Sequence, residues 1–155
     1  MINKNKNLIE YIGLSSYLPK DLKFFKKTSS KNIIKLPENR LGIKHLTKVS
    51  VDISILETKL ITTSMGKSLE GRILTGKKIL CYGFINYKFH YISTKEMQNI
   101  QLYTIKIPFV DSVITPASIK QEYSITISIF VDDITCNLIS ENEIFSYISF
   151  IISCD

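Results

Sequence analysis

The segment from Ile79 to Tyr91 constrains the fold most, because its side chains change character with a period of two. Successive side chains of a β-strand point to opposite faces of the sheet, so this period predicts one long strand. Upstream, Thr75-Gly76-Lys77 predicts a hairpin turn, since Gly adopts positive φ without steric cost. We therefore expect a hairpin over residues 69–91, with a bend or bulge at Gly83. The residues predicted to share one face are Ile79, Cys81, Gly83, Ile85, Tyr87, Phe89 and Tyr91.

The same alternation recurs along the rest of the chain. It appears in residues 49–55, 100–107, 123–131 and 144–154, and polar or Pro-containing segments separate these stretches. With 155 residues, of which 45% are hydrophobic, the chain is long enough to bury one sizeable core. Short strands at regular spacing with few helical stretches are typical of sandwiches. We predict an all-β fold, an antiparallel β-sandwich that is jelly-roll-like and carries an N-terminal extended arm.

Charge divides the chain into two parts. Residues 1–48 hold eleven Lys and Arg against three Asp and Glu, a net charge of +8, whereas the remainder carries −2. We interpret residues 1–35 as an N-terminal arm and basic linker, with a possible short helix from Pro19, and residues 36–155 as the sandwich domain. Two interpretations of the basic segment stay open. It is either a solvated, Lys-rich linker or an arm that meets an acidic surface.

No residue pattern indicates a catalytic, cofactor-binding or metal-binding site. The chain has no phosphate-binding glycine loop, no HExxH and no nucleophile-elbow motif, and His45 and His90 lie in different regions. Asp132-Asp133 is typical of a turn or bulge, because adjacent residues on a strand point to opposite faces. We therefore expect a protein that is not an enzyme and that needs no cofactor. We also expect it to bind no nucleic acid and to have no membrane span.

The candidate assembly residues lie at the two ends of the chain. A sandwich leaves unpaired backbone groups at its sheet edges, and an apolar arm could add a strand to a neighbouring subunit. Alternatively, the arm docks on its own domain or is disordered. The three cysteines form no CxxC pair, and reduced, partly buried thiols are the favoured interpretation. The sharper alternative is that Cys154 is exposed and cross-links subunits. The assembly candidates are Leu8, Ile9, Tyr11, Ile12, Leu14 and Cys154.

Several segments, in order, resemble the SPOCS domain of SipL-like sporulation proteins from endospore-forming bacteria. The resemblance spans about residues 36–152, with departures from the family pattern: Gln101 and Tyr103 stand where a His is frequent, and Glu143 stands where an Arg precedes the final Ile-Phe. The segments that carry it are Leu36-Pro37, Val49-Ser50-Val51, Leu69-Glu70-Gly71-Arg72-Ile73-Leu74-Thr75-Gly76-Lys77-Lys78, Tyr87-Lys88-Phe89-His90-Tyr91, Ile105-Lys106-Ile107-Pro108-Phe109, Ile114-Thr115-Pro116, Val131-Asp132-Asp133-Ile134 and Ile144-Phe145.

The resemblance implies a non-enzymatic structural protein of the bacterial endospore envelope, in the coat, exosporium or a spore appendage. Such a protein would be made in the mother-cell cytoplasm and deposited on the spore surface. Its partners would be other copies of itself and other envelope proteins, joined by β-edge or arm exchange. Two alternatives remain open. One is a sporulation adaptor that binds a specific coat-morphogenesis partner, and the other is a glycan-binding sandwich that stacks sugars on Tyr82 or Tyr103.

Overall fold

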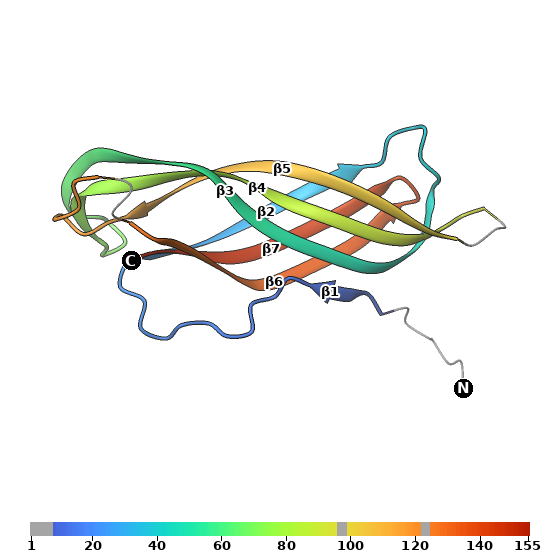
Figure 1. Ribbon diagram of the computed structural model, residues 1–155, viewed down its shortest axis with the longest axis horizontal. Coiled ribbons are helices and arrows are strands. Elements are labelled where there is room, and N and C mark those ends of the chain that lie inside the picture. The colour runs from blue at the N-terminus through green and yellow to red at the C-terminus, as the bar shows by residue number, and fades with distance from the viewer. Residues whose placement is uncertain (1–7, 96–98, 122–124) are drawn as a thin grey trace.

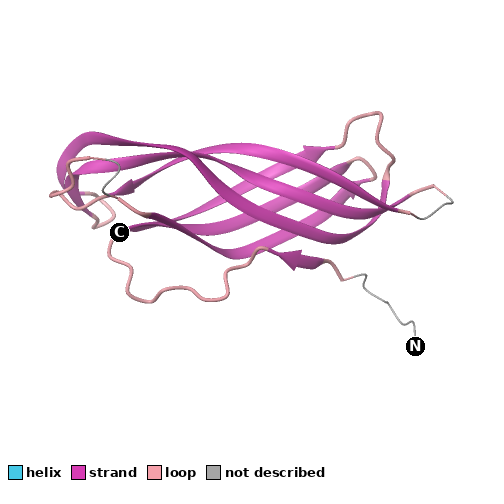
Figure 2. Cartoon of the chain, viewed as in Figure 1, coloured by secondary structure: helices cyan, strands magenta, loops and turns pink. Residues whose placement is uncertain are grey.

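The chain folds as a β-sandwich in a computed structural model that describes residues 8–95, 99–121 and 125–155. No helix occurs in those residues, as Figure 2 shows. One sheet has the strand order β1-β3-β4-β5, and the other has the order β2-β7-β6. The predicted all-β sandwich is thus confirmed. The strands are β1 (Glu10–Ile12), β2 (Phe25–Lys35), β3 (Ile43–Lys67), β4 (Ile73–Ser93), β5 (Ile100–Ile114), β6 (Ile127–Ser140) and β7 (Glu143–Cys154).

The two sheets form long, twisted layers that face each other (Figure 1). Within the larger sheet, β3, β4 and β5 pair antiparallel in chain order, so this part is a meander rather than the paired Greek keys of a jelly-roll. In the smaller sheet, β7 lies between β2 and β6 and pairs antiparallel with both. Strand β1 pairs parallel with β3.

The core lies between the layers and follows the predicted alternation of β4. Ile79, Cys81, Ile85 and Phe89 are completely buried, whereas the even-numbered residues from Leu80 to His90 lie on the outer face. From the opposite sheet, β7 contributes its own alternate positions, and the ring of Phe150 packs edge-on against that of Phe109 at 5.5 Å between centroids. One buried hydrogen bond of 2.7 Å joins the Tyr87 hydroxyl to Ser146 Oγ across the layers.

The β3–β4 turn lies elsewhere than the sequence predicts. The predicted turn at Thr75-Gly76-Lys77 is wrong, because β4 already begins at Ile73 and Gly76 lies within it. The chain reverses over residues 68–72, where the Gly71 N–H donates to the Ser68 carbonyl at 2.9 Å. Gly71 has a φ of +83°, so it supplies the left-handed conformation that this turn needs.

Gly83 serves a close approach between strands rather than a bulge in its own strand. The register irregularity lies in β3, between Ile55 and Glu57, opposite Gly83 and Tyr82. A Cβ on Gly83 would lie 2.1 Å from the Ser54 carbonyl oxygen, so only glycine lets β3 and β4 approach here. The predicted irregularity at Asp132 is confirmed, since the register between β6 and β7 shifts between Val131 and Asp133.

The predicted boundary of the sandwich domain also needs correction. Residues 25–35, which the sequence pattern assigned to the linker, form β2 and pair with β7 from Phe25 to Lys35. The expected helix from Pro19 is absent, because residues 19–24 contain no regular element. The sequence pattern does not indicate this strand, because Lys27, Lys31 and Lys35 make the segment look like a polar linker. In the structure, these three lysines lie on the exposed face of β2. The described part of the arm and linker is therefore residues 8–24.

Candidate functional site

The N-terminal arm, defined here as residues 8–15, lies where an edge of one sheet faces an edge of the other. Figure 1 shows β1 alongside the sandwich on the side where β3 and β6 lie. Strand β1 adds to the β3 edge in parallel, with Glu10 opposite Lys48 and Ile12 opposite Ser50. The alternative that the arm docks on its own domain is therefore the arrangement in this structure.

Two side chains of the arm also reach the edge of β6. The Tyr11 hydroxyl accepts a 2.9 Å hydrogen bond from the Cys136 N–H and donates one of 3.2 Å to the Cys136 carbonyl. Ser15 repeats this pattern, because its N–H donates to the Val131 carbonyl at 2.9 Å and its Oγ accepts from the Val131 N–H at 2.9 Å. The arm thus pairs with backbone groups on both edges, which would otherwise be free to bind another strand.

Close packing holds the arm between these edges. Gly13 has a φ of +120°, and a Cβ at this position would lie 2.1 Å from the Val51 carbonyl oxygen. Only glycine therefore permits the chain to pass so close to β3 after β1 ends. Burial raises the pKa of the Tyr11 hydroxyl, so Tyr11 binds Cys136 as a neutral phenol.

The five apolar residues predicted in the arm divide between two faces. Ile9 and Tyr11 pack against the hydrophobic core. Leu8, Ile12 and Leu14 point outward, with exposed fractions of 87%, 42% and 49%. The docked arm therefore leaves an apolar face uncovered. Sequence reasoning missed Gly13 and Ser15 as site residues, although a Gly within an apolar segment is a signal of a close backbone approach.

Cys154 does not belong to this site, and its predicted exposure is wrong. Its side chain points into the core from β7 and is 2% exposed, and its N–H donates to the Phe24 carbonyl at 2.9 Å. Burial raises the pKa of the Cys154 thiol to about 11, and the same holds for Cys81 and Cys136. The prediction failed because β7 continues to Cys154, which places this side chain in the core.

On the opposite side of the sandwich, an ion pair joins the edges of the two sheets. Lys26 on β2 forms an ion pair with Asp111 on β5 and joins the two remaining edges. Burial raises the pKa of the Asp111 carboxyl, but hydrogen bonds from Lys26, Thr28 and the Ser112 N–H outweigh burial and hold the pKa below its usual value. The two open sides of the sandwich thus differ. The side formed by β2 and β5 is joined by an ion pair, whereas the side formed by β3 and β6 is covered by β1.

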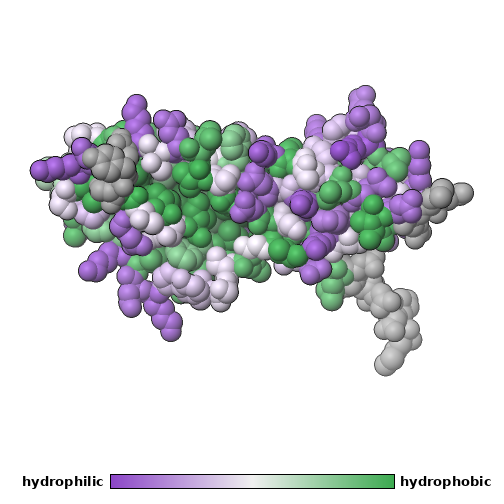
Figure 3. All heavy atoms as spheres, viewed as in Figure 1, coloured by the Kyte–Doolittle hydropathy of each residue, from purple (hydrophilic) through white to green (hydrophobic). Residues whose placement is uncertain are grey.

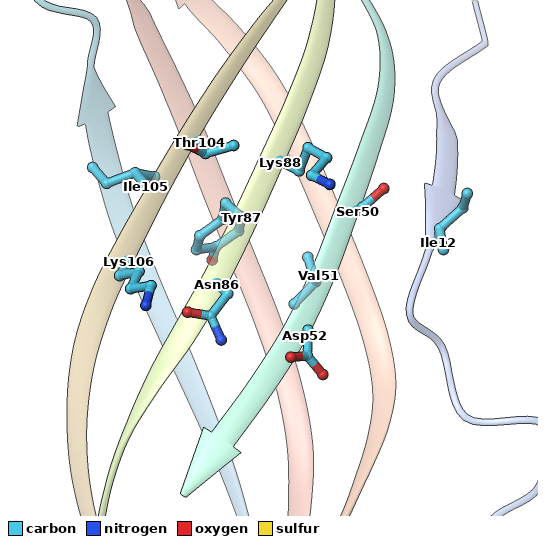
Figure 4. A pocket seen from close by; sticks show the side chains of 10 residues that line it. All are labelled: Ile12, Ser50, Val51, Asp52, Asn86, Tyr87, Lys88, Thr104, Ile105 and Lys106. Atoms are coloured by element: carbon cyan, nitrogen blue, oxygen red, sulfur yellow. The ribbon is translucent and has the colours of Figure 1, made fainter. Parts of the chain in front are cut away.

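A shallow groove of about 550 Å³ lies on the outer face of the larger sheet, beside the arm. Figure 4 shows Asp52, Asn86 and Lys106 as neighbours on adjacent strands, with Ile12 at the margin. Asn86 Nδ2 donates to Ser54 Oγ at 3.1 Å, while Lys106 lies over the Phe84 ring at 5.9 Å. The groove thus combines polar side chains of three neighbouring strands with apolar lining from Ile12 and Ile105.

The aromatic residues considered for sugar stacking do not form one platform. Tyr103 packs against the core, and the Arg40 guanidinium lies over its ring at 5.6 Å. Tyr82 lies on β4 between the buried Cys81 and Gly83, so it faces outward. Within residues 8–95, 99–121 and 125–155, no group of three or more His, Cys, Asp and Glu side chains is placed to hold a metal ion. The same residues include no helix long and apolar enough to cross a membrane.

No protein-family model, curated protein or solved structure matches the chain. The resemblance to the SPOCS domain therefore rests on the order of the sequence motifs alone.

Proposed function

We propose that this chain is a non-enzymatic structural protein of the bacterial endospore envelope, which assembles when subunits exchange their N-terminal arms. One observation carries the assembly mechanism: the arm satisfies backbone groups on two sheet edges through contacts that an identical arm from another subunit would reproduce. These contacts are the β1–β3 ladder and the bonds from Tyr11 and Ser15 to β6. The location in the coat, exosporium or an appendage is supported by the SPOCS-like motifs.

The length of the arm favours exchange. Strand β1 has three residues, so docking in the same subunit involves few backbone hydrogen bonds. Residues 16–24, between the arm and β2, contain no strand, so the connection can extend. Exchange of identical elements creates almost no new interface and is therefore a low-cost route to oligomers. Each subunit then donates one arm and accepts one, which produces an open chain of subunits when the arrangement does not close.

A designed disulfide distinguishes docking in the same subunit from exchange. Glu10 and Lys48 are opposite each other in the β1–β3 ladder, so the double variant Glu10→Cys, Lys48→Cys places two thiols at this contact. The native cysteines are buried and do not compete. Oxidation of assembled protein should give a ladder of covalent dimers and larger species on a non-reducing gel. Bands of monomer size only would contradict arm exchange, and a closed dimer only would favour the adaptor function.

A deletion tests the same mechanism by electron microscopy. Removal of residues 1–16 should abolish ordered assemblies, because the donated strand is lost. The matched control is Tyr17→Ala, which removes an exposed ring beyond the arm that contacts Phe130 at 5.9 Å between centroids. The control should assemble as the full chain does. Ordered polymers from the truncated protein would contradict the proposal.

A further inference from the structure

The tip of the β3–β4 hairpin carries the most exposed large apolar side chains of the sandwich. Leu69, Met65 and Ile73 are exposed by 109%, 77% and 76%. They lie at the end of β3, in the turn and at the start of β4, where Lys67 pairs with Ile73. None of the three belongs to the hydrophobic core or to the residues that pack against it. When several gather on one projecting element, they usually mark an interaction site.

Cationic side chains lie at this tip and further back along the hairpin, and the Lys77 amine donates to the Ile119 carbonyl. Residues 59–78 hold five cations, at Lys59, Lys67, Arg72, Lys77 and Lys78, and one carboxylate, at Glu70. The ion pairs that the described residues form join Lys26 to Asp111 and Lys27 to Asp132, so none of these five cations takes part in them. Figure 3 shows hydrophilic side chains projecting beside hydrophobic surface at this end of the molecule, on the left of the view.

A second segment extends the same surface. The start of β2 lies against the hairpin tip, and Phe25 and Lys23 line one side of a hollow of about 560 Å³ whose other side includes Arg72 and Ile73. Phe25 is itself 45% exposed. The end of the sandwich therefore presents apolar side chains from two segments, with cations from both.

We propose that this end of the sandwich docks on an anionic lipid surface. Met65, Leu69 and Ile73 enter the boundary between headgroups and acyl chains, while Lys67 and Arg72 bind lipid phosphates. Apolar side chains flanked by Lys and Arg are the arrangement that binds such an interface, and each cation near it contributes about 1 kcal/mol. A protein partner fits less well, because stable protein interfaces bury roughly 1,200–2,000 Å² and a hairpin tip offers little area.

This docking goes beyond the proposed function and is independent of it. The arm contacts β3 at residues 48–50, whereas the tip begins at Met65. These points are roughly 50 Å apart along an extended strand. Lipid binding and arm exchange therefore use separate surfaces, and a variant that fails in one should retain the other.

Vesicle flotation of the full chain tests the proposal. The protein should float with vesicles of phosphatidylcholine mixed with phosphatidylglycerol, and should bind vesicles of phosphatidylcholine alone at least tenfold more weakly. The double variant Leu69→Ser, Ile73→Ser keeps every charge and should lose at least tenfold in binding. The matched control is Leu56→Ser, which replaces a side chain that is 72% exposed on β3 outside the tip and should bind as the native chain does.

A charge variant completes the experiment. Lys67→Gln with Arg72→Gln should weaken binding about fivefold for each cation, since about 1 kcal/mol corresponds to that ratio. Failure of the native chain to float would overturn the proposal. Unchanged flotation of the Leu69→Ser, Ile73→Ser variant would also overturn it. The protein would then bind the vesicles through its charges alone, without insertion of apolar side chains. Self-association that needs these side chains but no lipid would assign the tip to contacts between copies, and would overturn it as well.

Discussion

The hydroxyl of Tyr11 pairs with both main-chain groups of Cys136, since it accepts from the N–H at 2.9 Å and donates to the carbonyl at 3.2 Å. One side chain on an arm that belongs to the larger sheet thus completes the edge of the smaller sheet. The two layers are consequently joined at an edge as well as through the core. This relationship makes the arm part of the folded sandwich, and it gives the first prediction.

Tyr11→Phe should lower the free energy of unfolding by about 1–3 kcal/mol. The substitution keeps the ring and removes the hydroxyl, so both main-chain groups of Cys136 lose their partner at a partly buried edge. Urea denaturation measures the change. Tyr17→Phe is the matched control, because Tyr17 is 67% exposed, and its effect should be near zero. Equal stability of the native chain and the Tyr11→Phe variant would show that the arm is not docked in solution.

Gly13→Ala should release the arm from β3. The added Cβ would lie 2.1 Å from the Val51 carbonyl oxygen, and φ of +120° is strained for alanine. We expect the amide protons of residues 10–12 to lose their protection from hydrogen exchange. Gly66→Ala is the control, because Gly66 has a φ of +135° but no atom within 4 Å of the added Cβ. Retained protection in Gly13→Ala would contradict the observed packing.

The ion pair between Lys26 and Asp111 should make stability depend on pH. The pKa of Asp111 is lower in the folded chain than in the unfolded one. Its contribution is therefore present above the unfolded pKa, about 3.9, and is lost as the pH falls through the folded pKa. Asp111→Asn should cost roughly 0.5–1 kcal/mol at pH 7, and this cost should shrink below pH ~4.

The cysteines should not react in the folded protein. Burial raises the pKa of the Cys81, Cys136 and Cys154 thiols to about 11, so few thiolates form near pH 8 and reagents cannot reach them. Titration with a chromogenic disulfide should detect almost no thiol in the native chain and three after denaturation. Rapid native labelling of Cys154 would restore the cross-linking hypothesis that its burial removes.

The local pattern was sufficient to predict the strand faces. In β4, the alternation of residues 79–91 predicts which side chains share a face. The structure confirms the shared face and shows that it is the buried one, with Gly83 also on it. For the same reason, the irregularity at Asp132-Asp133 was predictable. A period of two is a property of consecutive residues, so no distant contact is needed to interpret it. The adjacent turn was not predictable, because Gly71 and Gly76 give the same local signal and only the pairing of β3 with β4 distinguishes them.

By itself, the sequence determined that the chain forms strands, which side chains of a strand share a face, and that an apolar segment precedes the regular part. The tertiary structure alone decided that residues 25–35 pair with β7, that Cys154 enters the core, and that Tyr11 and Ser15 reach β6. The physical reason is that a strand's partner is chosen by contacts far apart in the chain. Tyr11 and Cys136 are separated by 125 positions, and nothing near either residue specifies the other.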